Sequence, residues 1–281
     1  MIGPSDFLAI KLTGAGPIAV DAIAERRDIP PAVGQALDEI CEAVEAQGSR
    51  LWMDAEQQVL QPGIDRWTTQ LMRKYNRNGK IFIYNTIQAY LKGAKTNLDE
   101  HIALAGNEGW GLGIKLVRGA YIEHEIRSLI HDKKEQTDTS YDLCVDTILS
   151  RKVPEGSDLE RFPDAALFLA THNAPSANKA LSIQRERVMA GLPTVALDCG
   201  QLVGMADELS FELIQAHEDS ASNSPSAKAA APRVYKCMAW GTVGECMGFL
   251  YRRAIENRGA VLRTKHMAQA LRHELRRRLS L

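Results

Sequence analysis

The sequence predicts an α/β fold in which parallel strands alternate with helices and form a (β/α) barrel. Seven short apolar runs are spaced along the chain, and most are continuous, as expected of parallel strands covered by helices. Segments with helical spacing lie between them, and repeated strand-then-helix order is typical of a parallel α/β architecture. Polar and titratable residues recur where the runs end, which is where the active site of such a barrel lies.

The expected strands are taken in chain order. They span residues 6–13, 49–55, 80–86, 111–118, 165–171, 194–200 and 233–240. Apolar residues three or four positions apart predict helices between them, as at Ile64, Trp67 and Leu71. Seven strands are one fewer than the eight of a closed barrel. Because the chain starts inside the first strand, the missing strand is expected upstream of Met1.

The C-terminal third contains a segment that breaks this pattern. Residues 218–232 are rich in Ser, Ala and Pro, which predicts a flexible loop between the sixth and seventh strands. Since one more strand follows, residues 1–281 are interpreted as a single domain. Residues 264–281 predict an amphipathic helix with three arginines at 276–278 beside an apolar stripe. That helix either packs on the barrel with a solvated basic face or contacts a membrane surface.

Residues 242–258 predict another helix, which begins at a capping box. Thr242 is a suitable N-cap, and Glu245 follows three residues later. The adjacent Arg252 and Arg253 leave two interpretations open. They belong to a solvated face with an i,i+4 pair to Glu256, or their guanidinium groups bind a carboxylate.

Composition and charge exclude several classes of protein. The chain has 281 residues, of which 45% are hydrophobic and 25% charged, as in a soluble globular protein. A net charge of -1 gives no reason to propose nucleic acid as a partner. No run approaches the ~18 apolar residues of a membrane span. The five cysteines contain no CxxC motif, which argues against a disulfide framework or a zinc site and indicates a reducing compartment. Residues 1–6 do not form a signal or transit peptide.

The ends of the expected strands carry the candidate functional residues. They are Lys11, Asp54, Glu56, Gln88, Lys115, Arg118, Tyr121, His172, Asn173, Gln201, Cys237 and Trp240. In a barrel these ends meet at one mouth. For any single one of these residues, a second interpretation stays open: it is polar only because the buried strand ends there, and it has no function. GWGLG at 109–113 is not GxGxxG, and no P-loop, HExxH or GxSxG motif occurs, so nothing supports a Rossmann dinucleotide site.

Seven motifs along the chain identify a family resemblance. They are FLAIKLT, MDAEQ, IYNTIQAYLK, IKLVRGAYIEHE, ATHN, GQLVGM and YRRAIENRG. In this order they resemble the proline dehydrogenase family, of the fungal mitochondrial type and without the N-terminal part. The resemblance implies a distorted (βα)8 TIM-like barrel whose first strand is missing here. It also implies non-covalent FAD, no metal, and a mouth capped by the RRAIEN helix.

The resemblance also implies roles for individual residues. Three cations match those that bind the substrate carboxylate: Lys11, Arg252 and Arg253. Four further positions match the substrate site: Asp54, Tyr121, Leu202 and Cys237. The positions that match flavin contacts are Gln88, Lys115, Arg118, Gly119, Thr171, His172, Asn173 and Glu256, with Lys115 near the N1/N5 edge. The chain departs from the family at Cys237 and Phe249, where tyrosines are usual.

The implied activity is oxidation of L-proline to Δ1-pyrroline-5-carboxylate by hydride transfer to flavin N5. It is expected to rise with pH, because the amine must be neutral. The resemblance further implies electron transfer to ubiquinone at the matrix side of the inner mitochondrial membrane. Three alternatives stay open: a hydroxyproline-preferring relative, suggested by Cys237; a truncated binding or regulatory protein; and an unrelated barrel aldolase that uses Lys11 or Lys115 as a Schiff base.

Overall fold

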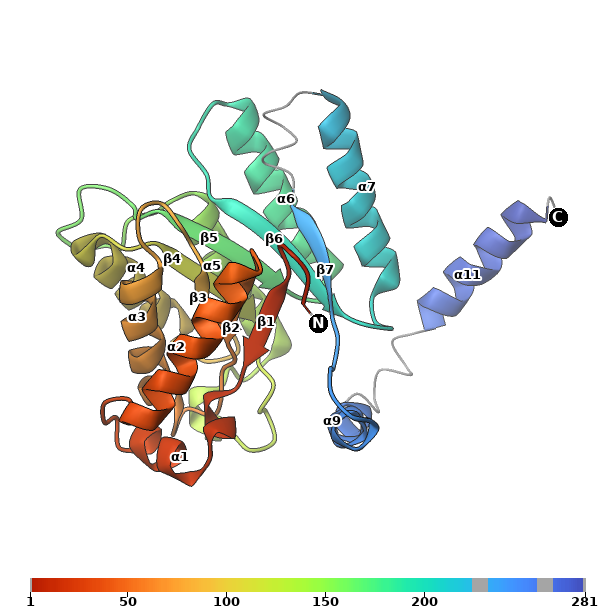
Figure 1. Ribbon diagram of the computed structural model, residues 1–281. Helices are drawn as coiled ribbons and strands as arrows, with labels where there is room; N and C mark the ends of the chain where they lie inside the picture. Colours follow the sequence, from red (N-terminus) through yellow and green to blue (C-terminus); the bar gives the residue numbers. More distant parts are fainter. Residues whose placement is uncertain (1, 224–231, 257–264, 280–281) are drawn as a thin grey trace.

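The computed structural model describes residues 2–223, 232–256 and 265–279, and it contains one curled sheet of seven parallel strands (Figure 1). The strands pair in chain order, and each is parallel to the next. They are β1 (Phe7–Ile10), β2 (Arg50–Met53), β3 (Ile83–Gln88), β4 (Leu112–Val117), β5 (Ala165–Ala170), β6 (Ala196–Leu202) and β7 (Arg233–Cys237). All seven predicted strands are therefore confirmed.

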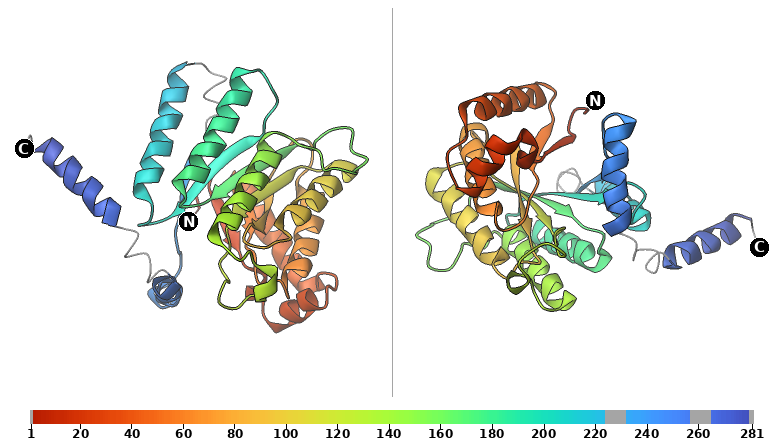
Figure 2. Two further views of the ribbon diagram at one scale, coloured as in Figure 1. Left: turned by 180° about the vertical axis from the view of Figure 1, so that it is seen from behind. Right: turned by 90° about the horizontal axis from the view of Figure 1, so that it is seen from below.

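Helices connect successive strands and cover the outer face of the sheet (Figures 1 and 2). The helices and 3-10 turns are η1 (Leu12–Ala15), α1 (Pro17–Ala24), α2 (Pro31–Ala46), α3 (Gln61–Tyr75), α4 (Ala94–Glu108), η2 (Arg127–Leu129), α5 (Lys134–Leu149), α6 (Ala174–Met189), α7 (Asp207–Asn223), α9 (Val243–Glu256) and α11 (Lys265–Arg278). The prediction of a loop over residues 218–232 was wrong for its first part. Helix α7 continues to Asn223, because Ser and Ala permit a helix until the proline-containing segment, and residues 224–231 lie outside the described residues.

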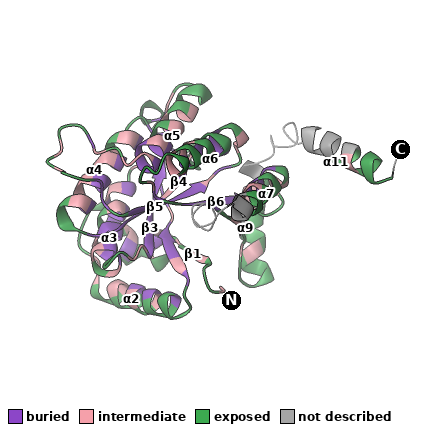
Figure 3. Cartoon of the chain, turned by 90° about the horizontal axis from the view of Figure 1, so that it is seen from above, coloured by how far each residue is buried: buried purple, intermediate pink, exposed green. Residues whose placement is uncertain are grey.

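The main core lies between the sheet and the helices. Strand residues such as Leu51, Ile83 and Leu167 meet helix residues such as Trp67 and Ile102, and all are at most 1% exposed. Figure 3 shows the buried strands in the centre and helices whose outer sides are exposed. Because both faces of the strands are covered, the strands read as continuous apolar runs in the sequence.

A second, aromatic core fills the inside of the curled sheet. The ring of Phe7 lies 4.9 Å from those of Trp52 and Phe168 and 5.3 Å from that of Tyr235, centroid to centroid. These residues come from β1, β2, β5 and β7, so the cluster joins strands at both ends of the sheet. Such pairs contribute about 0.5–1.5 kcal/mol each beyond their buried area.

Below this cluster, at the amino-terminal ends of the strands, lies a charge cluster around the buried Asp198. Arg50 Nη1 donates to Asp198 Oδ2 at 2.6 Å, and Arg233 Nε donates to Asp198 Oδ1 at 2.9 Å. The Tyr235 hydroxyl accepts from Arg50 Nη2 at 2.8 Å and donates to the Ser5 carbonyl at 3.1 Å. These side-chain contacts connect β7 to the segment before β1. The strands β1 and β7 themselves do not pair with each other in the described residues.

The last two helices extend away from this body (Figure 1). Helix α11 points away from the sheet; its Leu271 and Leu275 are 74% and 58% exposed, and Leu279, directly after the helix, is 58% exposed. None of the described helices combines the length and the apolar character that crossing a membrane requires.

Candidate active site

The carboxyl ends of the parallel strands face one side of the molecule, the side on which α9 lies (Figure 1). We call this opening the mouth. Chain order and parallel pairing together bring Lys11 after β1, Asp54 after β2, Gln88 at the end of β3 and Lys115 in β4 to one edge. The sequence-predicted convergence of strand-end residues is confirmed for these positions.

Lys11 and Tyr121 meet at a buried glutamate. Lys11 Nζ lies 2.8 Å from Glu56 Oε1 and 2.6 Å from the Tyr121 hydroxyl, which donates to Glu56 Oε2 at 2.5 Å. Thr13 Oγ1 also donates to Glu56 Oε1, at 2.7 Å. Burial alone would raise the pKa of Glu56, but the hydrogen bonds from Lys11, Tyr121 and Thr13 lower it below its usual value.

The same contacts shift the other two groups. Burial acts to lower the pKa of Lys11, yet its bonds to Glu56 and Tyr121 raise it overall. Burial and the bond to Glu56 raise the pKa of the Tyr121 hydroxyl, against the opposing charge of Lys11. At neutral pH the cluster is therefore an ammonium, a carboxylate and a neutral phenol.

Lys115 and Asp54 form a second ion pair deeper in the mouth. Lys115 Nζ lies 2.7 Å from Asp54 Oδ1 and 4.3 Å from the ring centroid of Trp52. The Lys115 side chain is only 12% exposed. The buried Trp52 Nε1 has no hydrogen-bond partner among the described residues. The ammonium is thus held by a carboxylate and an aromatic face, and a cation–π contact of this kind contributes about 0.5–2 kcal/mol.

Cys237 ends β7 beside this pair. Partial desolvation raises the pKa of its thiol, and the negative charge of Asp54 acts in the same direction. The positive charges of Lys115 and Arg253 oppose the shift, which places all four groups in one electrostatic neighbourhood. The Cys237 side chain remains exposed to solvent.

Arg118 is fixed by several contacts where the mouth borders α5 and α6. Its Nε donates to Asp138 at 2.9 Å, its Nη1 to Thr171 Oγ1 at 2.7 Å and its Nη2 to Ser176 Oγ at 2.9 Å. The guanidinium also lies 4.3 Å over the Tyr141 ring. The predicted Arg118 and Thr171 are therefore in direct contact.

Gly119 is required by its surroundings. Its φ of +141° lies in a region that side chains rarely adopt, and an added Cβ would come within 2.4 Å of the Tyr90 ring. A glycine here lets the chain turn after Arg118 while passing close to Tyr90.

His172, Asn173 and Leu202 lie where β5 and β6 end. The Leu202 backbone N–H donates to His172 Nε2 at 3.1 Å, so this ring nitrogen is the acceptor. Asn173 is the N-cap of α6, and its Oδ1 accepts from the Ser176 N–H at 3.0 Å. His172 is solvent-exposed, whereas Asn173 and Leu202 are half-buried.

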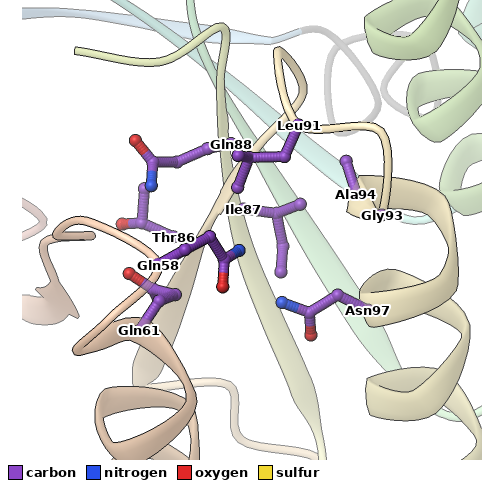
Figure 4. A pocket seen from close by; sticks show the side chains of 9 residues that line it. All are labelled: Gln58, Gln61, Thr86, Ile87, Gln88, Leu91, Gly93, Ala94 and Asn97. Carbon is purple, nitrogen blue, oxygen red and sulfur yellow. The ribbon is translucent and has the colours of Figure 1, made fainter. Parts of the chain in front are cut away.

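Gln88 is almost fully buried at the edge of a small polar pocket. Its Nε2 donates to the Glu56 carbonyl at 2.8 Å. The pocket lies between β3, the start of α3 and the start of α4 (Figure 4). It is lined by Gln58, Gln61, Thr86, Ile87, Gln88, Leu91, Gly93, Ala94 and Asn97.

Helix α9 follows β7 on the mouth side. Its predicted capping box is confirmed, because Glu245 Oε2 accepts from the Thr242 N–H at 2.8 Å and the Glu245 N–H donates to Thr242 Oγ1 at 3.4 Å. The side chains of Arg252 and Glu256 lie outside the described residues. The helix lies beside the end of β7 rather than across the mouth as the resemblance implied (Figure 2). The chain between them, residues 238–242, includes a bend at Gly241. Its apolar residues Val243 and Met247 are 80% and 59% exposed.

Two further residues complete the mouth: Glu56 was a candidate from its place at a strand end but had no assigned role, and Trp52 was not among the candidates. Glu56 stands two residues after Asp54 at the same strand end, and that spacing is a signal for a second carboxylate on one side of the chain. Trp52 is on the inner face of β2 and gives no such signal. Within the described residues, no cluster of three or more His, Cys, Asp and Glu side chains is arranged to hold a metal ion.

Comparisons with known proteins extend over most of the chain. The family model described as "Proline dehydrogenase" matches residues 2–266. Proline dehydrogenase 1, mitochondrial, of Caenorhabditis elegans is 34% identical over 265 residues, which cover 91% of this chain and 39% of that protein. The probable mitochondrial proline dehydrogenase of Schizosaccharomyces pombe is 32% identical over 251 residues, covering 86% and 49%. Hydroxyproline dehydrogenase of Bos taurus is 31% identical over 254 residues, covering 86% and 50%. The chain spans at most about half the length of these relatives.

A solved structure has the same fold. The bifunctional proline utilization A protein superposes with a TM-score of 0.68 at 24% identity, over 89% of this chain and 23% of that chain. Its likeness confirms the predicted fold class, an α/β fold of the distorted TIM-barrel type.

Proposed function

Because the chain belongs to the proline dehydrogenase family, we propose that it oxidises L-proline to Δ1-pyrroline-5-carboxylate, the first step of proline catabolism. The observation that carries the proposal is the arrangement of charges at the mouth. Two lysines, Lys11 and Lys115, point into one opening from β1 and β4, and each is held by a carboxylate. A cyclic amino acid with one carboxylate is a suitable ligand for such an opening.

On the substrate side, we assign carboxylate binding to Lys11, Arg252 and Arg253. The electrostatic contact of Arg253 with Cys237 supports its place at the mouth. Tyr121, Leu202 and Cys237 are assigned to the ring of the substrate. The ring of Tyr121 is suitably placed, because its hydroxyl is fixed at one end and its side chain remains half-exposed.

We propose non-covalent FAD as the cofactor, and the donor groups at the mouth fit it. Gln88, Lys115 and Arg118 offer an amide, an ammonium and a guanidinium, and the N-terminus of α6 at Asn173 is suited to an anionic group such as a phosphate. When bound, FAD would accept the hydride that leaves the ring carbon next to nitrogen. The proposed set is Gln88, Lys115, Arg118, Gly119, Thr171, His172, Asn173 and Glu256.

The protein's own contribution is orientation and electrostatics. The cations hold the substrate carboxylate, and Lys115 would place its positive charge beside the bound flavin, where it would stabilise negative charge. The substrate amine must be neutral before its neighbouring carbon loses a hydride, so the rate should rise with pH.

We further propose ubiquinone as electron acceptor and a mitochondrial location at the matrix side of the inner membrane. Relatives named as mitochondrial support the compartment. A peripheral membrane contact through α11 is supported by the exposed leucines at 271, 275 and 279 and by Arg276, Arg277 and Arg278. Sedimentation with anionic vesicles, lost on Leu275→Glu, would test this contact.

The experiment that tests the main proposal uses the purified chain reconstituted with FAD. We expect a yellow protein whose flavin absorbance is bleached by L-proline without oxygen, with a cyclic imine that condenses with o-aminobenzaldehyde. A protein that takes up no flavin, or a flavin that proline does not bleach, would overturn the proposal and favour a binding protein or a Schiff-base aldolase.

A hydroxyproline-preferring dehydrogenase is the second candidate. It is favoured by Cys237, whose side chain is much smaller than the tyrosine usual in the family. The similarity to a protein named hydroxyproline dehydrogenase supports the same candidate. Comparison of kcat/KM for the two amino acids decides between them.

A further inference from the structure

We propose that Glu56 is a positioning residue that fixes Lys11 and Tyr121 for the substrate carboxylate and ring. The inference rests on the proposed function and adds a residue to which that function assigns no role. Glu56 is only 8% exposed, yet it lies in the wall of the mouth, directly beneath two side chains that are more exposed.

Every oxygen of the Glu56 carboxylate is used by its neighbours. Oε1 accepts from Lys11 Nζ at 2.8 Å and from Thr13 Oγ1 at 2.7 Å, and Oε2 accepts from the Tyr121 hydroxyl at 2.5 Å. The three donors come from the end of β1, from η1 and from the loop after β4. One carboxylate thus joins three separate segments around the mouth.

The backbone of Glu56 is held equally firmly. Its N–H donates to Gln61 Oε1 at 2.8 Å, and its carbonyl accepts from Gln88 Nε2 at 2.8 Å. Gln61 Nε2 donates in turn to Asp65 Oδ1 at 2.8 Å. Because the main chain of Glu56 is fixed on both sides, its carboxylate has a fixed position. We infer that this carboxylate positions Lys11 and Tyr121, and not the reverse.

Lys11 needs such support. Its side chain is 47% exposed, and an unpaired lysine at that exposure would occupy many rotamers. Glu56 and Tyr121 take two of the ammonium donors, so the third is directed by the geometry of the other two. An incoming carboxylate then meets an ammonium that is already oriented, and binding costs less conformational entropy.

Tyr121 is fixed by the same group. Its hydroxyl donates to Glu56 Oε2 at 2.5 Å, and the Ala55 carbonyl lies 3.1 Å from the same hydroxyl oxygen. The ring therefore stands with one end immobilised and one face toward the mouth. Loss of Glu56 would release both the cation and the ring.

The negative charge of Glu56 sets up two opposite effects. Removing it would lessen repulsion of an anionic substrate, but it would also release Lys11. We expect positioning to dominate, because one ammonium and two hydroxyl groups already compensate the carboxylate. The proposal therefore predicts weaker binding, whereas simple charge repulsion predicts tighter binding.

The test uses the FAD-loaded protein and the variants Glu56→Ala and Glu56→Gln. The ligand for calorimetry is cyclopentanecarboxylate, which keeps the ring and carboxylate of proline but undergoes no oxidation. The matched control is Asp38→Asn, because Asp38 binds Lys74 and the Tyr75 hydroxyl in the same manner on outer helices. We expect Glu56→Ala to raise the Kd and the KM for proline about tenfold, with kcat changed less than about threefold.

Glu56→Gln keeps one acceptor oxygen but replaces the other with a donating NH2 group, so it should fall between wild type and Glu56→Ala. Asp38→Asn should bind as wild type. Unchanged or tighter binding in Glu56→Ala would overturn the inference and leave the proposed function intact. If Glu56→Ala does not fold, the Kd of Glu56→Gln takes its place: weaker binding supports the inference, and unchanged or tighter binding overturns it. Wild-type protein that neither binds the analogue nor oxidises proline would instead overturn the proposed function.

Discussion

Lys115 Nζ donates to Asp54 Oδ1 at 2.7 Å across two neighbouring strand pairs of the sheet, from β4 to the end of β2. The Lys115 side chain is 12% exposed and that of Asp54 28%, so the pair is shielded from most of the solvent. An ammonium this far from water depends on its counterion more than a surface lysine does.

The first prediction follows from this pair. Asp54→Asn should lower the free energy of unfolding by about 1–3 kcal/mol, because Lys115 keeps its charge and loses its counterion. Denaturant unfolding followed by circular dichroism measures the change. The surface pair of Lys74 and Asp38 provides the control, since Asp38→Asn should cost under about 1 kcal/mol. Equal losses in both variants would mean that Lys115 is not stabilised by Asp54.

The second prediction concerns the two arginines of α9. Arg252→Met or Arg253→Met should raise the KM for proline roughly tenfold to a hundredfold while flavin stays bound, because each removes a charge-assisted contact with the carboxylate. Steady-state kinetics and the flavin spectrum measure both effects. Arg73→Met, which removes a cation paired with Glu108 on the outer helices, should leave KM unchanged. A KM close to that of wild type in both α9 variants would mean that the two arginines belong to a solvated face and do not bind the substrate.

The third prediction concerns selectivity at Cys237. The neighbours Met238 and Trp240 are 74% and 86% exposed, so neither fills the space next to Cys237. Cys237→Tyr should therefore increase the ratio of kcat/KM for proline over trans-4-hydroxyproline by closing that space. Met238→Tyr, one residue further along, should leave the ratio as it is. An unchanged ratio in Cys237→Tyr would show that this position does not govern substrate choice.

The fourth prediction is a pH dependence of stability. The hydrogen bonds of Glu56 lower its pKa below the usual value of 4.5 in the folded protein, so its contribution is present above that value and is lost as pH falls through the lowered pKa. Lys11 has a raised pKa, so its contribution is present below 10.5 and is lost as pH rises through the raised pKa.

Wild type should therefore exceed Glu56→Gln in free energy of unfolding at pH 7, and the difference should shrink toward pH 3. Urea unfolding at the two pH values measures it. Glu39→Gln, at an exposed carboxyl that accepts from Gln35, should follow wild type at both values. A difference that persists at pH 3 would contradict the assignment to the ionised carboxylate.

The fifth prediction concerns Gly119. Gly119→Ala should lower stability by roughly 1–3 kcal/mol, because it combines an unfavourable φ with a clash against the Tyr90 ring. Thermal unfolding measures the loss. Gly93→Ala, which meets nothing within 4 Å, is the control. Adding Tyr90→Ala to Gly119→Ala should restore part of the loss by removing the clash, and no restoration would contradict that cause.

The sequence determined the elements of this fold, because their causes are local. Seven continuous apolar runs became seven strands, and the Thr242–Glu245 capping box starts α9 as predicted. Parallel order followed from the helices between the strands, and it placed the polar strand ends at one mouth. Composition alone predicted that the loop begins at residue 218, but helix α7 continues to Asn223.

Only the tertiary structure decided which of the strand-end residues meet. Glu56 pairs with Lys11, 45 residues away, and Arg50 pairs with Asp198, 148 residues away. Such partners depend on the register of neighbouring strands and on how far the sheet curls, because those two quantities fix which side chains face inward and at what separation. No local pattern contains them, so the sequence identified the mouth and the folded chain selected the contacts within it.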